Sequence, residues 1–308
     1  MRTYSMESWS LAILMMLGPI FASQDRATHA AANPEQLRAA LARVKAGETI
    51  LIASGRYPGG FFVRGLRGRP GEPIVLRAAD PDHPPIFEGS TGAFQLSGVA
   101  HVELHDLILA GASGNGINID DGGTVETPSH HVVLRRLFVR DVGPRGNHDG
   151  IKLSGVDEFR VEDCTVERWG SGGSGIDMVG CHRGEIVGCT FRHGDATGSE
   201  GIQAKGASSD VVIRRCRFEH AGQRAVNIGG STGLPYFRPK GAKYEAKAIT
   251  VEDCTFVGSM APIAFVGVDG AVVRHNTLYR PRRWAFRILQ ETREPGFAPS
   301  RGARSPTT

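Results

Sequence analysis

The sequence lacks two features that would assign a function class at once: an apolar run long enough to cross a bilayer, and a basic patch interleaved with aromatic residues. Its N-terminal apolar stretch, residues 11–22, is too short to span a membrane. The formal net charge is only +4 over 308 residues, so without a basic patch we expect no nucleic-acid partner. Apolar residues elsewhere come in short runs and not in helical stripes. With 41 glycines, this composition favours many short strands separated by turns.

The N-terminal segment has the composition of a secretory signal peptide. Arg2 precedes the apolar stretch, and small residues follow it through Ala32. Cleavage could follow Ala22, Ala30 or Ala32, and the sequence leaves that choice open. We therefore expect residues 1–32 to be a signal peptide or pro-segment. The protein is then secreted or periplasmic, with no membrane span once the signal is removed.

Four of the five cysteines occupy the same place in four successive repeats. The segments are VEDCTV (161–166), IVGCTF (186–191), IRRCRF (213–218) and VEDCTF (251–256). The same frame carries Leu in residues 104–109 and 134–139, and Asn in residues 273–278. Self-similarity at a period of roughly 20–50 residues predicts a stacked repeat architecture.

Stacking argues against disulfides among these cysteines. Equivalent residues of adjacent parallel strands lie about 4.8 Å apart with their side chains parallel, whereas bridged Cβ atoms lie roughly 3.5–4.5 Å apart. We therefore expect the ladder cysteines to be buried small apolar residues: Cys164, Cys189, Cys216 and Cys254. Cys181 lies outside this ladder and is expected in a turn.

A second column of short strands is equally regular. It runs through GINI (116–119), GIKL (150–153), GIDM (175–178), GIQA (201–204), AVNI (225–228), PIAF (262–265) and AFRI (285–288). Alternation turns the second residue of each segment inward and the third outward. The outward column is therefore Asn118, Lys152, Asp177, Gln203, Asn227, Ala264 and Arg287. One strand per coil on two or three faces predicts an all-β solenoid, a parallel β-helix. A leucine-rich repeat is rejected because its LxxLxL-then-Asn pattern and repeat helices are missing.

We expect a short helix to cap the N-terminal end of this solenoid. Asn33 is a suitable N-cap, Pro34 suits the first helical position, and Gly47 ends the pattern. The solenoid is then expected over residues 33–290. Residues 291–308 show no strand pattern and are predicted to be an irregular, disordered tail. No cap is visible at the C-terminal end, so the last coil could self-associate.

The outward column and its flanking turns gather polar residues that suit chemistry. Asp149, Asp177 and Glu200 are expected to approach one another, because equivalent positions of adjacent coils lie about 5 Å apart. Crowded carboxylates bind a cation or share a proton, which makes these three candidate ligands for a metal cation. The residues beside them are His148, Lys152, Gln203, Lys205, Arg224 and Asn227. A solvated, inert outer face is the alternative.

Two coils are lengthened, over residues 120–131 and 229–247. Insertions in solenoids map to loops on one face, often the binding face. Tyr236 and Arg238 in the second insertion are therefore candidate contacts to a sugar chain. A surface loop that packs its own aromatic residues is an equal alternative.

The chain resembles the secreted right-handed parallel β-helix proteins, the superfamily of pectate lyase, polygalacturonase, alginate lyases and mannuronan epimerases. The resemblance covers residues 33–290 and rests on the cap helix, AGETILIASGRYPGG, PIVLRAADPDHP and the GI-x-[L/I/M] coils. It implies a single-stranded right-handed parallel β-helix, with an acidic polysaccharide as partner.

Within that superfamily, the chain is similar in part to the chondroitinase B and alginate lyase family. Glu200 and Lys205 in SEGIQAKGASSDVVIRRCRF hold positions similar to that family's acidic residue and lysine. The resemblance implies Lys205 as the base and Ca²⁺ as the ion that neutralises the uronate carboxylate. The chain departs from the pattern at Gly229, where the family places an arginine. It departs again near Ile202 or Gln203, where a second acidic calcium ligand would fall.

Two other motifs match in part. Residues 147–150, Asn-His-Asp-Gly, are similar to the Asn-Thr-Asp-Gly of polygalacturonases, whose following Asp pair is reduced here to Asp177. The same residues share only His-Asp with the Asp-Pro-His-Asp of mannuronan epimerases. Hydrolysis needs two carboxylates at a defined separation, a requirement that this chain fits poorly.

The sequence therefore predicts an exported carbohydrate-active protein that cleaves a uronate-containing polysaccharide by β-elimination. Lys205 is the expected base and His148 the alternative, with Ca²⁺, or Lys152 and Arg224, stabilising the enolate-like charge. Substrate contacts are expected from Asn118, Gln203, Asn227, Tyr236, Arg238 and Arg287. The alternatives are a non-catalytic carbohydrate-binding or cell-surface structural protein, a glycoside hydrolase and a uronate C5-epimerase.

Overall fold

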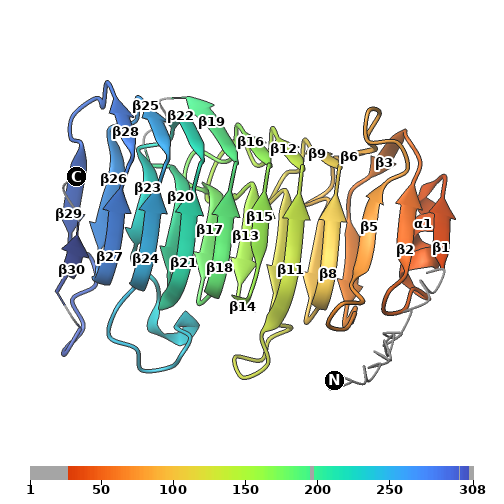
Figure 1. The fold of residues 1–308 in the computed structure, drawn as a ribbon, viewed down its shortest axis with the longest axis horizontal. Helices are drawn as coiled ribbons and strands as arrows, with labels where there is room; N and C mark the ends of the chain where they lie inside the picture. Colours follow the sequence, from red (N-terminus) through yellow and green to blue (C-terminus); the bar gives the residue numbers. More distant parts are fainter. Residues whose placement is uncertain (1–26, 195–197, 298, 305–308) are drawn as a thin grey trace, which may run out of the picture.

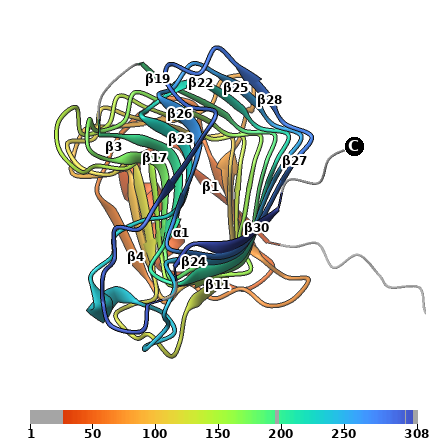
Figure 2. The ribbon, with the colours of Figure 1, turned by 90° about the vertical axis from the view of Figure 1, so that its left-hand side faces the viewer.

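The computed structural model describes residues 27–194, 198–297 and 299–304. Successive coils contribute strands to three parallel sheets, and the coils stack into an elongated solenoid (Figure 1). Seen end-on, the three sheets enclose a common interior (Figure 2). The predicted all-β fold, a parallel β-helix, is confirmed.

The three sheets are named A, B and C here. Sheet A contains β1 (Thr28–Ala31), β2 (Thr49–Ile52), β5 (Ile74–Ala78), β8 (Ala100–His105), β11 (Ser129–Arg135), β14 (Val156–Asp157), β15 (Arg160–Glu162), β18 (His182–Val187), β21 (Ser208–Arg214), β24 (Ala246–Glu252), β27 (Val268–Arg274) and β30 (Arg301–Arg304). Sheet B contains β3 (Arg56–Pro58), β6 (Ile86–Glu88), β9 (Ile108–Ala110), β12 (Phe138–Arg140), β16 (Thr165–Glu167), β19 (Thr190–Gly194), β22 (Arg217–Ala221), β25 (Thr255–Val257) and β28 (Thr277–Tyr279). Sheet C contains β4 (Phe61–Arg64), β7 (Phe94–Ser97), β10 (Ile117–Asp120), β13 (Ile151–Ser154), β17 (Ser174–Val179), β20 (Glu200–Lys205), β23 (Arg224–Gly229), β26 (Ala261–Val266) and β29 (Phe286–Leu289).

A residue with a left-handed backbone conformation turns the chain from sheet A into sheet B. It lies directly before the position that the four ladder cysteines occupy. Asp163, Arg215 and Asp253 have φ values of 52°, 52° and 53°, a conformation that is uncommon in residues other than glycine. In the coil of Cys189 the same place is held by Gly188, with φ 65°. This recurring corner points the side chain that follows it into the interior of the coil.

The ladder cysteines are buried and free, as predicted. Cys164, Cys189, Cys216 and Cys254 are each at most 2% exposed, and none forms a disulfide. Each thiol donates a hydrogen bond to a backbone carbonyl. Cys181 is buried too, in the turn between sheets C and A.

The inward column of sheet C and a stack of rings on sheet B fill the interior. Six of the seven predicted inward residues are buried: Ile117, Ile151, Ile176, Ile202, Val226 and Ile263. The seventh, Phe286, lies in the last strand of the sheet and is 44% exposed. On sheet B the rings of Phe191, Phe218 and Phe256 stack at centroid separations of 4.9 and 4.6 Å. Burial of each such side chain contributes about 1.5–3 kcal/mol to stability.

Helix α1 (Pro34–Leu41) covers the N-terminal end of the stack, as predicted. Asn33 Oδ1 accepts the backbone N–H of Gln36 at 2.9 Å, and Gln36 Oε1 accepts the N–H of Ala32 at 2.8 Å. This reciprocal cap satisfies two donors at the start of the helix. Leu37 and Ala40 are buried in the core of the first coil.

Strand β1 shows that the β-helix begins before the predicted residue 33. It pairs in parallel with β2, so residues 28–31 belong to sheet A. The remainder of the predicted signal peptide, residues 1–26, lies outside the described residues. In the described part of the chain, no helix is long and apolar enough to span a membrane.

The C-terminal segment also differs from the prediction of an irregular tail. Strand β30 pairs in parallel with β27 and extends sheet A, so residues 301–304 are ordered by backbone hydrogen bonds that the side-chain pattern does not reveal. The neighbouring last strand of sheet C leaves Phe286 and Ile288 44% and 70% exposed. Self-association at this end stays a prediction.

The buried thiols predict how the protein reacts with a thiol reagent. Burial raises the pKa of Cys181 to about 12, and only a thiolate reacts readily. All five cysteines should therefore be unreactive in native buffer and all five should react in denaturant without reductant. Colorimetric thiol titration measures both states. A count below five in denaturant would reveal a disulfide.

Candidate functional site

The outward column of sheet C pairs in the predicted register. Asn118 of β10 lies opposite Lys152 of β13, Lys152 opposite Asp177 of β17, and Asp177 opposite Gln203 of β20. The column continues through Asn227 of β23 to the last strand. In-register pairing therefore places one residue of each coil in a single outer row.

The three predicted metal ligands do not form one stack. Glu200 lies opposite Ser174 and not opposite Asp177. Ile151 pairs with Ile176, which puts Asp149 opposite Ser174 and in the same row as these two. Oδ1 of Asp149 accepts the backbone N–H of Ser174 at 2.7 Å. Asp177 belongs to a different row, three residues further along its strand. The expectation of a carboxylate stack is therefore wrong.

Asp177 is the buried centre of the site. It is 1% exposed, and its Oδ2 accepts a hydrogen bond from Lys152 and forms an ion pair with Lys205, whose Nζ lies 3.2 Å away. Lys205 Nζ also donates to Gln203 Oε1 at 2.7 Å, and Lys152 Nζ lies 3.6 Å from Asp149 Oδ2. A buried carboxylate is strongly unfavourable unless it is paired. Two ammonium groups from the flanking coils compensate this one.

Burial and charge shift the protonation of the groups beside Asp177. Burial first, and then the charge of Asp177, raises the pKa of Asp149 to about 6, against the opposing charge of Lys152. Burial lowers the pKa of Lys152, but the charges of Asp177 and Asp149 outweigh burial and leave this pKa raised. Lys152 is therefore a fixed positive charge at neutral pH.

Glu200 is the second carboxyl with a strongly shifted pKa. Burial raises the pKa of Glu200 to about 7, against the charges of Arg224 and Lys205. Arg224 itself donates to Asn227 Oδ1 at 3.3 Å and to Glu291 Oε1 at 2.9 Å. Asn227 is fully buried, which suits a residue that holds Arg224 and does not suit the predicted substrate contact.

Two clefts open along the outer side of sheet C. The first, which we name the His148 cleft, has a volume of about 510 Å³ and is lined by residues that include Phe62, Gln95, Asn118, Asn147 and His148. The second, the lysine cleft, has a volume of about 630 Å³ and is lined by residues that include Asp121, Asn147, Lys152, Lys205, Tyr236 and Arg238. Because Asn147 lines both clefts, they adjoin.

The clefts bring together some of the predicted site residues and not others. Those that line a cleft are Asn118, His148, Lys152, Lys205, Tyr236 and Arg238. Those that line neither cleft are Asp149, Asp177, Glu200, Gln203, Arg224, Asn227 and Arg287. Arg287 lies in β29, with its guanidinium 4.9 Å from the ring centroid of Trp284. Asn147 is not among the predicted contacts, although its place directly before His148 in a polar turn is a signal for it.

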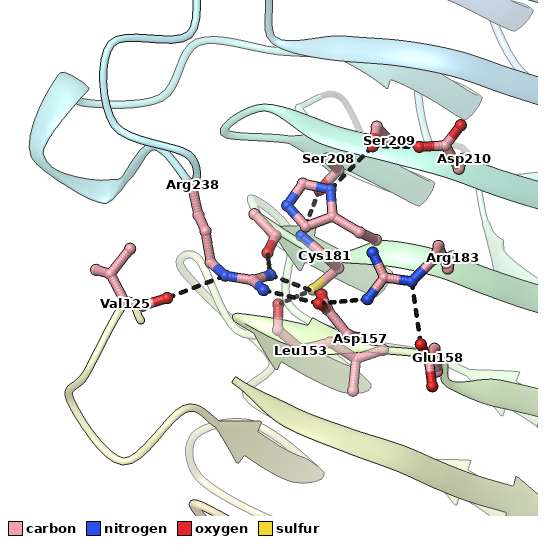
Figure 3. Close-up of polar contacts among 12 residues, drawn as sticks. Val125, Leu153, Asp157, Glu158, Cys181, Arg183, Ser208, Ser209, Asp210 and Arg238 are labelled. Carbon is pink, nitrogen blue, oxygen red and sulfur yellow. Dashed lines mark hydrogen bonds and ion pairs between the residues drawn. The ribbon is translucent and has the colours of Figure 1, made fainter. Parts of the chain in front are cut away.

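Arg238 fastens the long loop 229–247 to the coils beside the lysine cleft (Figure 3). Its Nη1 donates to Asp157 Oδ1 at 2.6 Å and its Nη2 to Asp157 Oδ2 at 2.8 Å, while Nε donates to Val125 O at 3.2 Å. Asp157 is 5% exposed and also accepts a hydrogen bond from Arg183 at 2.8 Å. No local pattern singles out Asp157, because its partner Arg238 lies 81 residues away.

The same loop packs one aromatic residue inward and exposes another at the lysine cleft. Phe237 is buried, and its ring lies edge-on to Phe297 at 6.1 Å, which is ordinary loop packing. Tyr236, the last residue of the short 3-10 helix η1 (Leu234–Tyr236), is 72% exposed and lines the lysine cleft. The loop therefore packs one aromatic residue inward and presents the next to the cleft.

The predicted carboxylates do not fit a calcium ion. In the described part of the chain, the group of three ligand atoms that lie within 4.8 Å of one another belongs to histidines of sheet A, not to Asp149, Asp177 and Glu200. Calcium needs six to eight oxygen ligands, whereas Lys152 already pairs with Oδ2 of Asp149, and both Lys152 and Lys205 pair with Oδ2 of Asp177.

Comparison with known families assigns the repeats of this chain. The family model described as "Right handed beta helix region" matches residues 91–278. The chain belongs to this right-handed β-helix family. The match covers the cysteine ladder and most of the sheet C column, and it agrees with the handedness implied by the resemblance. No curated protein sequence matches the chain.

Solved structures similar to this right-handed β-helix include two polysaccharide lyases. An alginate lyase from Paenibacillus sp. str. FPU-7 is 18% identical, with a TM-score of 0.61 over 85% of this chain and 97% of that one. A pectate lyase is 13% identical, with a TM-score of 0.53 over 86% of this chain and 73% of that one. A lacto-N-biosidase from Eubacterium ramulus is 11% identical, with a TM-score of 0.47 over 87% and 64%. At identities of 18% and 13%, the likeness to the two lyases shows the fold alone.

The raised pKa of Glu200 makes the stability of this right-handed β-helix depend on pH. The pKa in the folded protein, about 7, exceeds the ordinary value of 4.5. The folded state therefore binds a proton more tightly than the unfolded state, and stability falls as the pH rises between these two values. Glu200→Gln removes this loss. Near pH 8 the variant should be more stable than the wild type by up to about 3 kcal/mol, with almost no gain near pH 4.

Urea unfolding of both proteins at the two pH values measures the difference. Glu126→Gln, which changes an exposed glutamate of the 120–131 loop, is the control and should alter stability little at either pH. An advantage of Glu200→Gln that is equal at both pH values would contradict the assigned protonation.

Proposed function

We propose that this protein binds a uronate-containing polysaccharide along the outer side of sheet C and cleaves it by β-elimination in the lysine cleft. The observation that carries the proposal is the pair of ammonium groups of Lys152 and Lys205, which line one cleft and share the buried Asp177. Every uronate unit carries a carboxylate, and cations held in a cleft attract such groups.

Further features support a sugar chain as the ligand. The His148 cleft adjoins the lysine cleft through Asn147, which suits a ligand of several sugar units. Tyr236 offers an exposed ring beside the lysines, and aromatic side chains with a polar tip are frequent in binding sites. The alginate lyase and the pectate lyase that share this fold act, by their names, on such chains.

In the proposed reaction, Lys152 and Lys205 have different roles. Lys152 pairs with the uronate carboxylate and stabilises the negative charge that develops on it. Lys205 acts in its uncharged form, after losing one proton to solvent: it removes the proton from C5, the electron pair forms the C4–C5 double bond, and the bond from C4 to the bridging oxygen breaks. The protonated Lys205 then returns its proton to the leaving oxygen. His148, in the adjoining cleft, is the alternative base.

A substrate panel tests the proposal. Alginate, pectate and glycosaminoglycans are incubated with the protein, and the ultraviolet absorbance of unsaturated uronate is followed. With the polysaccharide that is cleaved, Lys205→Ala should lower kcat at least about 100-fold. Lys247→Ala, which removes an exposed lysine of sheet A, is the matched control and should leave activity unchanged. Full activity in a Lys205→Ala, His148→Ala double variant would contradict both assignments of the base.

A chelator separates the lysine mechanism from a calcium-assisted one. Because Lys152 supplies the positive charge that stabilises the uronate carboxylate in this proposal, EDTA should leave the rate unchanged. Loss of activity in EDTA that only Ca²⁺ restores would favour the calcium mechanism.

A non-catalytic polysaccharide-binding protein is the second candidate. Two observations favour a binding protein without catalysis. Gly229 stands at the place of the lyase family's arginine, and Lys205 is already held by Gln203 and Asp177. In that case no panel member yields product, yet acidic polysaccharides bind and Lys152→Ala weakens the binding. Reducing-end and proton-NMR assays on the same panel detect hydrolysis or C5-epimerisation.

A further inference from the structure

Three histidines converge on the outer side of sheet A, apart from the residues that line the sheet C clefts. His130 of β11 lies opposite Ala100 of β8, which sets His131 opposite His101. The rings of His101 and His131 stack at 4.2 Å, and the ring of His130 lies 5.1 Å from that of His131. One ring nitrogen from each histidine lies within 4.8 Å of the other two. The three nitrogens can therefore reach one small ion.

The backbone presents two of these rings side by side. His101 and His131 have φ values of 50° and 53°, in the left-handed region. Glu158 and Arg183 hold the same conformation in the next coils, with φ 50° and 55°, so the bend belongs to the coil. What distinguishes the coils of β8 and β11 is that histidines occupy the bend.

A carboxylate orients one of the three rings. Glu158 Oε2 lies 2.7 Å from His131 Nε2, and Glu158 also accepts from Arg183 Nε at 3.2 Å (Figure 3). A carboxylate that accepts the Nε2–H proton leaves a lone pair on Nδ1 of His131. That Nδ1 lies 2.9 Å from Nδ1 of His130. Metal-ligating histidines are characteristically held by a carboxylate in this way.

We propose that His101, His130 and His131 form a binding site for a divalent transition-metal ion of the zinc class. Three imidazole nitrogens with a fourth position open to water are a common zinc ligand set, and nitrogen ligands select such ions over calcium or magnesium. The bound ion joins the coils of β8 and β11 and so stabilises the N-terminal half of the solenoid. This site does not depend on the function proposed for sheet C.

The repeat spacing in the sequence indicates that two of these histidines stack. The segments 104–109 and 134–139 are 30 residues apart, and so are His101 and His131.

Zinc titration of the tag-free, metal-stripped full chain tests the site. Calorimetry in competition with a chelator should give one equivalent of bound Zn²⁺. His131→Gln and His130→Gln should weaken binding at least about 100-fold, and Glu158→Gln about 10- to 100-fold, as expected for loss of an orienting carboxylate. His83→Gln is the matched control, because His83 pairs with Asp80 at 2.8 Å on the exposed surface and, among the described residues, belongs to no group of three metal-ligating side chains. It should bind as the wild type does.

Two further measurements test for the zinc site even if a variant folds poorly. Zn²⁺ should raise the Tm of the wild type and of His83→Gln but not that of His131→Gln. X-ray absorption at the zinc edge of the wild type should show three imidazole ligands without the use of any variant. The proposal is overturned if no stoichiometric binding occurs, if His131→Gln binds as tightly as the wild type, or if fewer than two imidazoles coordinate the ion.

Discussion

Parallel pairing in register is the constraint on which the rest of this structure depends. Each strand hydrogen-bonds to the same position of the next coil, so a residue type repeated at one place becomes a continuous row. The buried isoleucines of sheet C, the cysteine ladder and the stacked phenylalanines of sheet B are rows of this kind. The left-handed corner before each ladder residue repeats from coil to coil and keeps the rows aligned.

The same constraint concentrates charge on the outer side of sheet C. Lys152 and Asp177 are successive members of one row, and Lys205 reaches the same carboxylate from the end of β20. Asp177 needs both cations because a buried charge without partners is strongly destabilising. In return it holds both lysines at the cleft, where their side chains remain 19% and 17% exposed. A buried acid thus positions two cations that can meet an acidic ligand.

The sequence predicts these rows well because alternation and a repeat period suffice to define them. It predicts the site only in part. Which side chains meet depends on how many residues separate each one from the inward isoleucine of its strand. Asp149 and Glu200 lie two residues before the inward isoleucines of their strands, whereas Asp177 lies one residue after its own. That difference of three positions separates the acids that were expected to stack. The contact of Arg238 with Asp157 depends on the path of a long loop, which no local pattern determines.

Hydrogen exchange with and without a uronate oligosaccharide tests most directly where the ligand binds. With binding over the lysine cleft, exchange should slow in the turn before β13, in the ends of β13 and β20 and in loop 229–247, because these segments line the cleft. Sheet B, on another side of the solenoid, should exchange at an unchanged rate. Slowed exchange confined to sheet B or sheet A, with sheet C unaffected, would contradict the assignment of the binding surface.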